Sequence, residues 1–175
     1  MYSQSVSTTT GGLADANFVE VEKQFIRERG YPDFDWVSYG TPSPVNRLTK
    51  PLPECRVAMV TTAGAHLKTD LPFNLRSRIG DHTYREIPNE ANLNDLVLSH
   101  VGYNIVRVSE DKNCVFPLDR LRELESEGII GALATRHYSF MGYIAVTEPL
   151  INETAPEVAE KLKADEVDLV LLAPA

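Results

Sequence analysis

Short apolar runs alternate with amphipathic stretches along most of the chain. Continuous apolar runs are typical of buried strands, and they predict strands at 56–62, 95–99 and 167–173, with a short strand or turn at 129–133. Apolar residues at helical spacing predict helices over 15–29, 117–127 and 149–164. We therefore expect an α/β fold with three α/β/α layers and a mostly parallel sheet, of the Rossmann or flavodoxin-like kind.

The N-terminal part of the chain has a different pattern. Residues 1–14 are rich in Ser, Thr and Gly without apolar periodicity, which predicts a flexible arm followed by a single domain over 15–175. Prolines and aromatic residues crowd 31–53, so this segment is expected to be extended and to wrap the domain surface. Alternatively, Trp36 covers the surface of a partner protein.

Composition and charge narrow the function classes. A formal net charge of −8 argues against nucleic-acid binding, because phosphate binding requires a basic surface. The longest apolar run is far too short to span a membrane, and Cys55 and Cys114 have no metal-binding spacing. No glycine-rich phosphate-binding loop occurs. We expect a protein of a reducing, cytoplasmic compartment that binds small molecules or proteins.

Ligands of open α/β sheets collect beyond the carboxyl ends of the strands, so the residues after each predicted strand are candidates. The first two such segments offer hydroxyl groups, a phenol and titratable rings. The catalytic candidates there are His66 and His100. The substrate-binding candidates there are Thr61, Thr62, Ser99 and Tyr103.

A third candidate segment follows the predicted short strand 129–133. Arg136 suits an anionic substrate group, His137 is a further catalytic candidate, and Tyr138 and Ser139 are substrate-binding candidates. In each segment the alternative is structural, with threonines that cap a helix and histidines that are satisfied in the core. Three imidazoles can also converge on zinc, but their scattered spacing makes us expect no metal site. Both cysteines are expected to be inert apolar fillers.

Several longer strings in fixed order carry a family resemblance. They are VTTAGAHL, FNLRSRIGDHTYREIP, LVLSHVGY, NCVFPLDRLRELESEGIIG and RHYSFMGYI, followed by AEKLKADEVDLVLLAPA. Together they resemble the selenoprotein B family of the glycine, sarcosine, betaine and D-proline reductases, from about residue 37 to 175. The resemblance implies a cytosolic reductase subunit that cleaves a carbon–nitrogen bond of an amino-acid-like or N-methylated glycine-like substrate.

The resemblance also implies a nucleophile and partners. In family members a selenocysteine or cysteine follows the strand that matches 167–173, and we expect that segment to be missing from this chain. We therefore expect no cofactor in this chain, and other reductase subunits or a second copy as partners. Two alternatives remain open. One is a catalytically silent binding or assembly subunit that oligomerises through the same fold, and the other is a racemase-like or lyase-like enzyme with His66 or His100 as its base.

Overall fold

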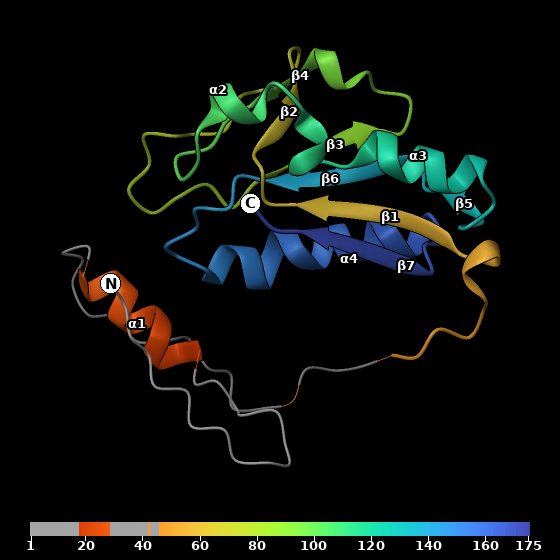
Figure 1. Ribbon diagram of the computed structural model, residues 1–175, viewed down its shortest axis with the longest axis horizontal. Helices are drawn as coiled ribbons and strands as arrows, with labels where there is room; N and C mark the ends of the chain where they lie inside the picture. The colour runs from red at the N-terminus through yellow and green to blue at the C-terminus, as the bar shows by residue number, and fades with distance from the viewer. Residues whose placement is uncertain (1–17, 29–41, 43–45) are drawn as a thin grey trace, which may run out of the picture. The chain divides into compact units, whose positions relative to one another are not determined.

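A computed structural model describes residues 18–28, 42 and 46–175 (Figure 1). The chain divides into two compact units, Met1–Asn46 and Arg47–Ala175. In the first unit, helix α1 (Phe18–Glu28) confirms most of the helix predicted at 15–29. The predicted arm over 1–14 and Trp36 lie outside the described residues, and the single domain over 15–175 stays a prediction.

The second unit is built around the parallel strand β1 (Arg56–Thr61). Strand β7 (Leu169–Ala173) pairs with β1 on one side, in parallel. The short strands β5 (Ala132–Leu133) and β6 (Arg136–Phe140) pair in parallel with successive halves of β1 on the other side. Outside β6 lies β3 (Tyr84–Pro88), which is antiparallel. The arrowheads of β1, β6 and β7 therefore point the same way (Figure 1).

Helices pack on opposite faces of this sheet. Val57 and Met59 belong to a core cluster with two leucines of α3 (Leu118–Ser126). Because strand residues alternate between faces, Val60 points to the other side, where it packs with Tyr138 and Val158. Val158 lies on α4 (Ala155–Ala164), which follows a π-helical turn, Leu150–Thr154. The mixed, mostly parallel sheet with its helices confirms the α/β class, and the Rossmann or flavodoxin-like assignment stays a prediction.

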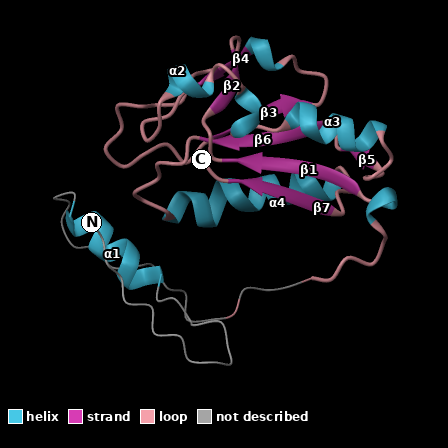
Figure 2. Ribbon diagram, viewed as in Figure 1, coloured by secondary structure: helices cyan, strands magenta, loops and turns pink. Residues whose placement is uncertain are grey.

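The apolar runs at 56–62 and 167–173 became β1 and β7, but the strand predicted at 95–99 was wrongly placed. Strand β4 (Leu96–Leu98) pairs antiparallel with β2 (Ala65–Leu67) in a separate two-stranded ribbon, outside the main sheet (Figure 2). Ser99 is hydrogen-bonded through its N–H to Gly64 O at 2.8 Å, so the ribbon returns to the end of β1. The short helix α2 (Ile105–Val108) follows the ribbon.

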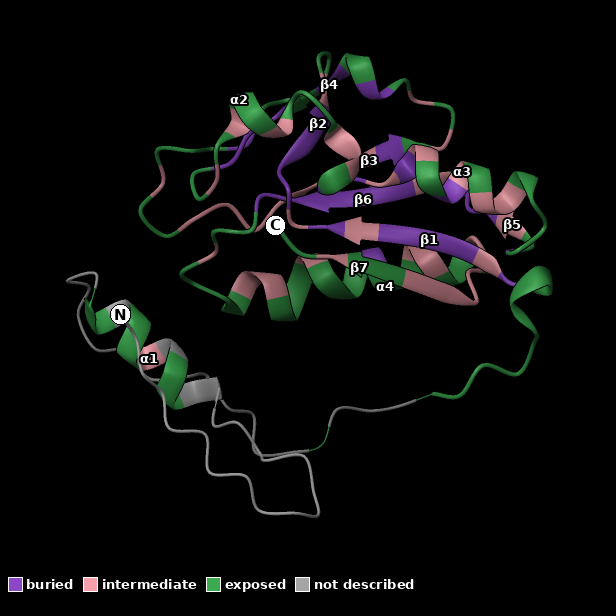
Figure 3. Ribbon diagram, viewed as in Figure 1, coloured by how far each residue is buried: buried purple, intermediate pink, exposed green. Residues whose placement is uncertain are grey.

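Buried residues concentrate along β1, β2 and β6 (Figure 3). Strand β7 is less covered, because Leu171 is 38% and Leu172 is 70% exposed. In parallel strands, paired residues point to the same face, so Leu171 beside Met59 and Leu172 beside Val60 are exposed on opposite faces. Among the described helices, none is long and apolar enough to cross a membrane.

Candidate functional site

The ends of β1, β6 and β7 meet at one border of the sheet, which we call the carboxyl edge (residues 61–64, 140–142 and 173–175). Thr62 N–H donates to Ala173 O at 3.2 Å, and Gly64 N–H donates to Phe140 O at 2.7 Å. Thr61 Oγ1 lies 2.8 Å from Val115 O and 2.9 Å from Ala173 O. The fold thus uses Thr61 to tie strands and loops together, while Thr62 remains half-buried at the surface of the edge.

Gly64 lets the β2–β4 ribbon approach this edge. Its φ is +66°, in the left-handed region, and a Cβ built on it would lie 2.0 Å from Ser99 O. Only glycine combines this conformation with so close a backbone approach. The second predicted segment, which contains His100 and Tyr103, is thereby brought to the first, as we expected for residues of one site.

His100 offers one hydrogen-bond donor at the carboxyl edge. Gly102 N–H donates to its Nδ1 at 2.8 Å, so in the neutral ring the proton is on Nε2. Burial lowers the pKa of His100, which favours this neutral form. A Cβ on Gly142 would lie 2.9 Å from His100 Nε2 and 2.7 Å from Thr62 O, so only glycine at this position lets the chain pack this closely against His100 and Thr62. Nε2 itself has no hydrogen-bond partner among the described residues.

Tyr103 holds the His100 ring. The two rings stack with their centroids 4.4 Å apart, and the Tyr103 hydroxyl donates to Ala63 O at 2.6 Å. Burial, with a smaller contribution from Cys114, raises the pKa of Tyr103 to about 12, so it stays a neutral donor. These contacts indicate that Tyr103 positions the His100 ring.

His66 and Ser99 form a closed pair next to the edge. Leu67 O lies 2.8 Å from His66 Nδ1, which must therefore carry the proton, and His66 Nε2 accepts from Ser99 Oγ at 3.0 Å. His66 is only 3% exposed. All of its hydrogen-bonding capacity is used within the protein, so its role is structural.

The third predicted segment is a strand and not a loop, which corrects the expected placement of its residues. Arg136 begins β6 and therefore lies at the border opposite the carboxyl edge. Its Nε and Nη2 bind the Asp165 carboxylate at 2.7 and 2.9 Å, and its Nη1 contacts Glu86 Oε2 at 3.2 Å. These carboxylates raise the pKa of Arg136, and they occupy the fork that was expected to bind a substrate anion.

His137, Tyr138 and Ser139 lie in the core of the sheet. Ser139 Oγ accepts from Ala65 N–H at 2.8 Å. The Tyr138 hydroxyl is buried without a hydrogen-bond partner among the described residues, and burial raises its pKa. The structure therefore places this trio inside the fold and brings together Thr62, His100 and Tyr103 instead.

The His137 side chain replaces a backbone hydrogen-bond partner of β1 at the point where the pairing changes from β5 to β6. From the Val57–Leu133 pair to the Val60–Tyr138 pair, β1 advances three residues and the β5–β6 side five. In this gap Met59 N–H donates to His137 Nδ1 at 3.1 Å, and His137 Nε2 lies 3.3 Å from Asn89 Oδ1. The ring is fully buried, and this burial lowers its pKa to about 4.

This depressed pKa predicts an acid-dependent loss of stability. In the unfolded chain His137 titrates near about 6.5, so its contribution to folding is complete above that pH. It declines as the pH falls from about 6.5 towards 4, by at most about 1.4 kcal/mol per pH unit. His137→Gln keeps an acceptor for Met59 N–H but does not titrate. We expect its free energy of unfolding, measured by urea denaturation, to change less with pH over this range. If the free energy of unfolding changed equally with pH in the native protein and in His137→Gln, the low pKa assigned to His137 would be contradicted.

The described residues form no metal site, and the two cysteines differ in their exposure. No group of three or more His, Cys, Asp or Glu side chains in that part of the chain could hold a metal ion. Cys55 is buried, as expected for an apolar filler, whereas Cys114 is exposed, so the expectation was wrong for Cys114. Gly142 was missed among the site residues, although a glycine directly after an apolar strand end was the available signal.

Known proteins are similar to this chain over most of its length, including the carboxyl edge. The family model for glycine/sarcosine/betaine reductase selenoprotein B matches residues 21–175. The chain belongs to this family. The selenoprotein B strings VTTAGAHL, LVLSHVGY and RHYSFMGYI contribute Thr62 and Gly64, His100 and Tyr103, and Gly142, respectively, so three separate strings of the likeness meet at the carboxyl edge.

Relatives in the selenoprotein B family are named for different substrates. The chain is 46% identical over 133 residues to the D-proline reductase subunit gamma of Acetoanaerobium sticklandii, covering 75% of this chain and 54% of the relative. It is 30% identical over 151 residues to the glycine reductase complex component B subunit gamma of Symbiobacterium thermophilum, covering 85% and 33%. It is 33% identical over 124 residues to the sarcosine reductase complex component B subunit beta of Peptoclostridium acidaminophilum, covering 69% and 27%.

The chain thus spans about half the length of the D-proline relative and a third or less of the other two. No solved structure matches it significantly.

Proposed function

We propose that this chain supplies the substrate-facing edge of a reductase that cleaves a carbon–nitrogen bond of an amino acid or an N-methylated glycine. The names of its relatives support the reaction class, because they are D-proline, glycine, sarcosine and betaine reductase subunits. The observation that carries the proposal is that Nε2 of His100 has no hydrogen-bond partner among the described residues and lies close to Gly142 and Thr62 at the carboxyl edge.

His100 binds the substrate carboxylate in this proposal. Those four substrates share a carboxylate and differ in the substitution of the nitrogen, so a fixed carboxylate site serves the whole class. A neutral imidazole N–H donates to a carboxylate without itself changing protonation state, and a partly buried position strengthens the bond. The sequence suggested an acid–base role for His100. In this proposal His100 acts instead as a hydrogen-bond donor through Nε2, because its Nδ1 accepts from Gly102 N–H.

The nucleophile of the reaction is part of the same proposal. The likeness implies a selenolate or thiolate after the strand that became β7, and Ala175 N–H donates to Thr62 Oγ1 at 2.9 Å, next to the His100 site. Attack there forms a carbon–selenium or carbon–sulfur bond while the electron pair of the carbon–nitrogen bond moves to nitrogen, which takes a proton from water. One thiol of a dithiol then attacks the selenium or sulfur, so that the carbon–selenium or carbon–sulfur bond breaks and the carbon takes a proton. The second thiol displaces the nucleophile, which is thereby regenerated, and the dithiol becomes a disulfide.

A second candidate function is assembly without catalysis. The relatives are subunits of reductase complexes, and the outer side of β7 pairs with no other strand of the described residues. Leu171 and Leu172 expose apolar surface on both faces of that strand, which suits contact with another reductase subunit or a second copy.

The two functions are separated by a product assay on the protein purified from its native cells together with its co-purifying subunits. D-proline, glycine, sarcosine and betaine are each supplied with dithiothreitol. Reductive opening of the proline ring yields 5-aminopentanoate, which mass spectrometry detects, and the other three release ammonia or a methylated amine. We expect turnover of one of the four. An intact complex that turns over none of them would favour the assembly function.

A further inference from the structure

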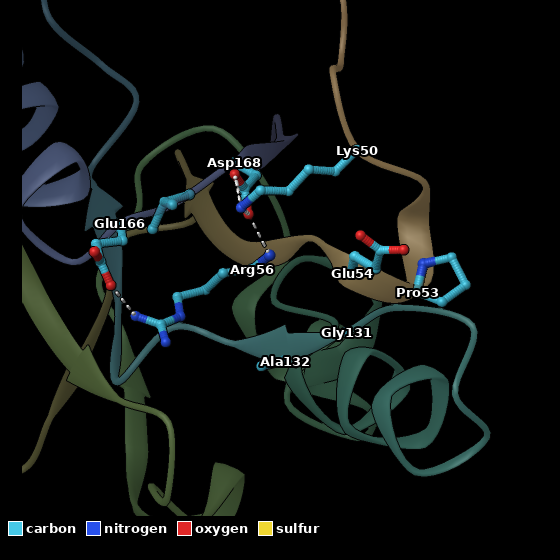
Figure 4. A pocket seen from close by; sticks show the side chains of 9 residues that line it. Lys50, Pro53, Glu54, Arg56, Gly131, Ala132, Glu166 and Asp168 are labelled. Carbon is cyan, nitrogen blue, oxygen red and sulfur yellow. Dashed lines mark hydrogen bonds and ion pairs between the residues drawn. The ribbon is translucent and has the colours of Figure 1, made fainter.

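An open cavity of about 530 Å³ lies at the border opposite the carboxyl edge, where β1, β5 and β7 begin (Figure 4). Its volume is within the range of small-molecule sites. Charged side chains of both signs line it, namely Lys50, Glu54, Arg56, Glu166 and Asp168. The proposed reductase function uses none of these residues.

Two of these charged side chains, Lys50 and Asp168, already bind each other within the fold. Lys50 Nζ lies 2.8 Å from Asp168 Oδ1, and Arg56 N–H donates to Asp168 Oδ2 at 2.9 Å. The Asp168 carboxylate therefore joins the segment before β1 to the start of β7, as the dashed lines of Figure 4 show. The charged side chains of the cavity that remain available to a ligand are therefore those of Arg56, Glu54 and Glu166.

Arg56 keeps one edge of its guanidinium open. Its Nη1 donates to Asp165 O at 2.8 Å, while Nε and Nη2 have no partner among the described residues. These two nitrogens form the edge that binds a carboxylate in a bidentate manner. Elsewhere in the same protein, Arg136 uses this very edge to bind Asp165 at 2.7 and 2.9 Å.

The two glutamates contribute negative charge without a close partner. Glu54 is exposed, and no described residue binds its carboxylate. Glu166 is 85% exposed in its side chain and only 3.7 Å from Arg56 Nη1, which is a loose contact. Its backbone has φ 54°, a left-handed conformation that favours glycine after a helix. This conformation caps α4, since Glu166 N–H donates to Lys163 O at 3.0 Å and Val167 N–H to Leu162 O at 3.1 Å, and it leaves the Glu166 side chain exposed at the cavity.

We propose that this cavity binds a small zwitterion of the amino-acid class. The ligand carboxylate binds Nε and Nη2 of Arg56, and the ligand's cationic nitrogen donates to Glu54 and Glu166. The open edge of Arg56, the unpartnered carboxylate of Glu54 and the loosely paired carboxylate of Glu166 together match a ligand that carries both charges, since an anion or a cation alone satisfies only one side. The site lies at the opposite end of the strands from His100, so it is distinct from the proposed reductase site and does not depend on it.

Three ring compounds of matched shape test the charge requirement. L-proline is zwitterionic, pyrrolidine carries only the cation, and cyclopentanecarboxylate carries only the anion. In ¹⁵N-resolved NMR titrations of the full chain, we expect L-proline to shift the backbone amides of Gly131, Ala132 and Asp168. The two singly charged compounds are expected to bind at least tenfold more weakly. Equal affinities for all three would overturn the proposal.

Variants locate the site. Arg56→Gln and Glu54→Gln are each expected to weaken L-proline binding at least tenfold, whereas Arg120→Gln, which removes an exposed ion pair on α3, is expected to leave it unchanged. Unchanged binding in Arg56→Gln, or L-proline shifts confined to Gly64, Gly102 and Gly142, would refute the site. The readout is binding and not turnover, so a failure here leaves the reductase assay unaffected, and a failure of that assay leaves this result intact.

Discussion

Replacing His100 with alanine is expected to lower kcat/KM of the assembled reductase by about 10–100-fold, mainly through a raised KM, because the lost hydrogen bond to the substrate carboxylate is present in both the bound substrate and the transition state. Nδ1 of His100 is occupied by Gly102 N–H, so only Nε2–H is lost from the substrate side. Burial keeps the pKa of His100 low, so the neutral donor form persists through neutral pH. The native protein should therefore lose no activity through protonation of His100 at neutral pH.

Rescue separates this role from a structural one. The alanine variant leaves a ring-sized space against Tyr103, and added imidazole is expected to restore part of kcat/KM by supplying the missing N–H. His137→Gln serves as the matched histidine control, since His137 lies in the core and not at the edge. If both variants lost activity in proportion to their lowered melting temperatures, the proposed contact between His100 and substrate would be wrong.

Gly64→Ala is expected to lower the free energy of unfolding by about 3–5 kcal/mol. The added Cβ would meet Ser99 O at 2.0 Å in addition to the strain of φ +66°. Gly128 has nearly the same φ, +68°, with nothing within 4 Å of its Cβ position. Gly128→Ala isolates the conformational cost, about 1 kcal/mol.

Urea denaturation of both variants gives the difference directly. The excess loss in Gly64→Ala measures the contact between the β2–β4 ribbon and the end of β1, which places His100 at the carboxyl edge. Equal losses in the two variants would mean that this approach is looser than the structure shows.

Apolar runs and helical periodicity were enough to find the framework. The apolar runs at 56–62 and 167–173 predicted the strands β1 and β7, although β7 is less buried than such a run suggests, and the stripe containing Val158 and Leu162 predicted α4. These segments pack on apolar surface, so their residue types carry the signal.

Strand β6 was missed for a physical reason. Its residues Arg136, His137 and Ser139 are polar, and each is held by a specific partner, Asp165, Met59 N–H and Ala65 N–H respectively. Such long-range hydrogen bonds and ion pairs leave no periodic apolar pattern in the sequence. The segment was consequently interpreted as a polar loop.

The candidate site was found in part by one general rule. Residues after β1 and after the β2–β4 ribbon do converge, which brings Thr62, His100 and Tyr103 together as the rule for strand ends predicted. The ribbon reaches the edge by an antiparallel return and not as a parallel strand, a topology that the alternation of strands and helices did not reveal.

The most direct test of the proposed substrate side is a parallel product assay of the native complex and of complexes carrying His100→Ala or His137→Gln. We predict reductive carbon–nitrogen cleavage by the native and His137→Gln proteins, with a loss of about 10–100-fold in kcat/KM and imidazole rescue only for His100→Ala. Full activity of His100→Ala would contradict the assignment of the carboxyl edge as the substrate side.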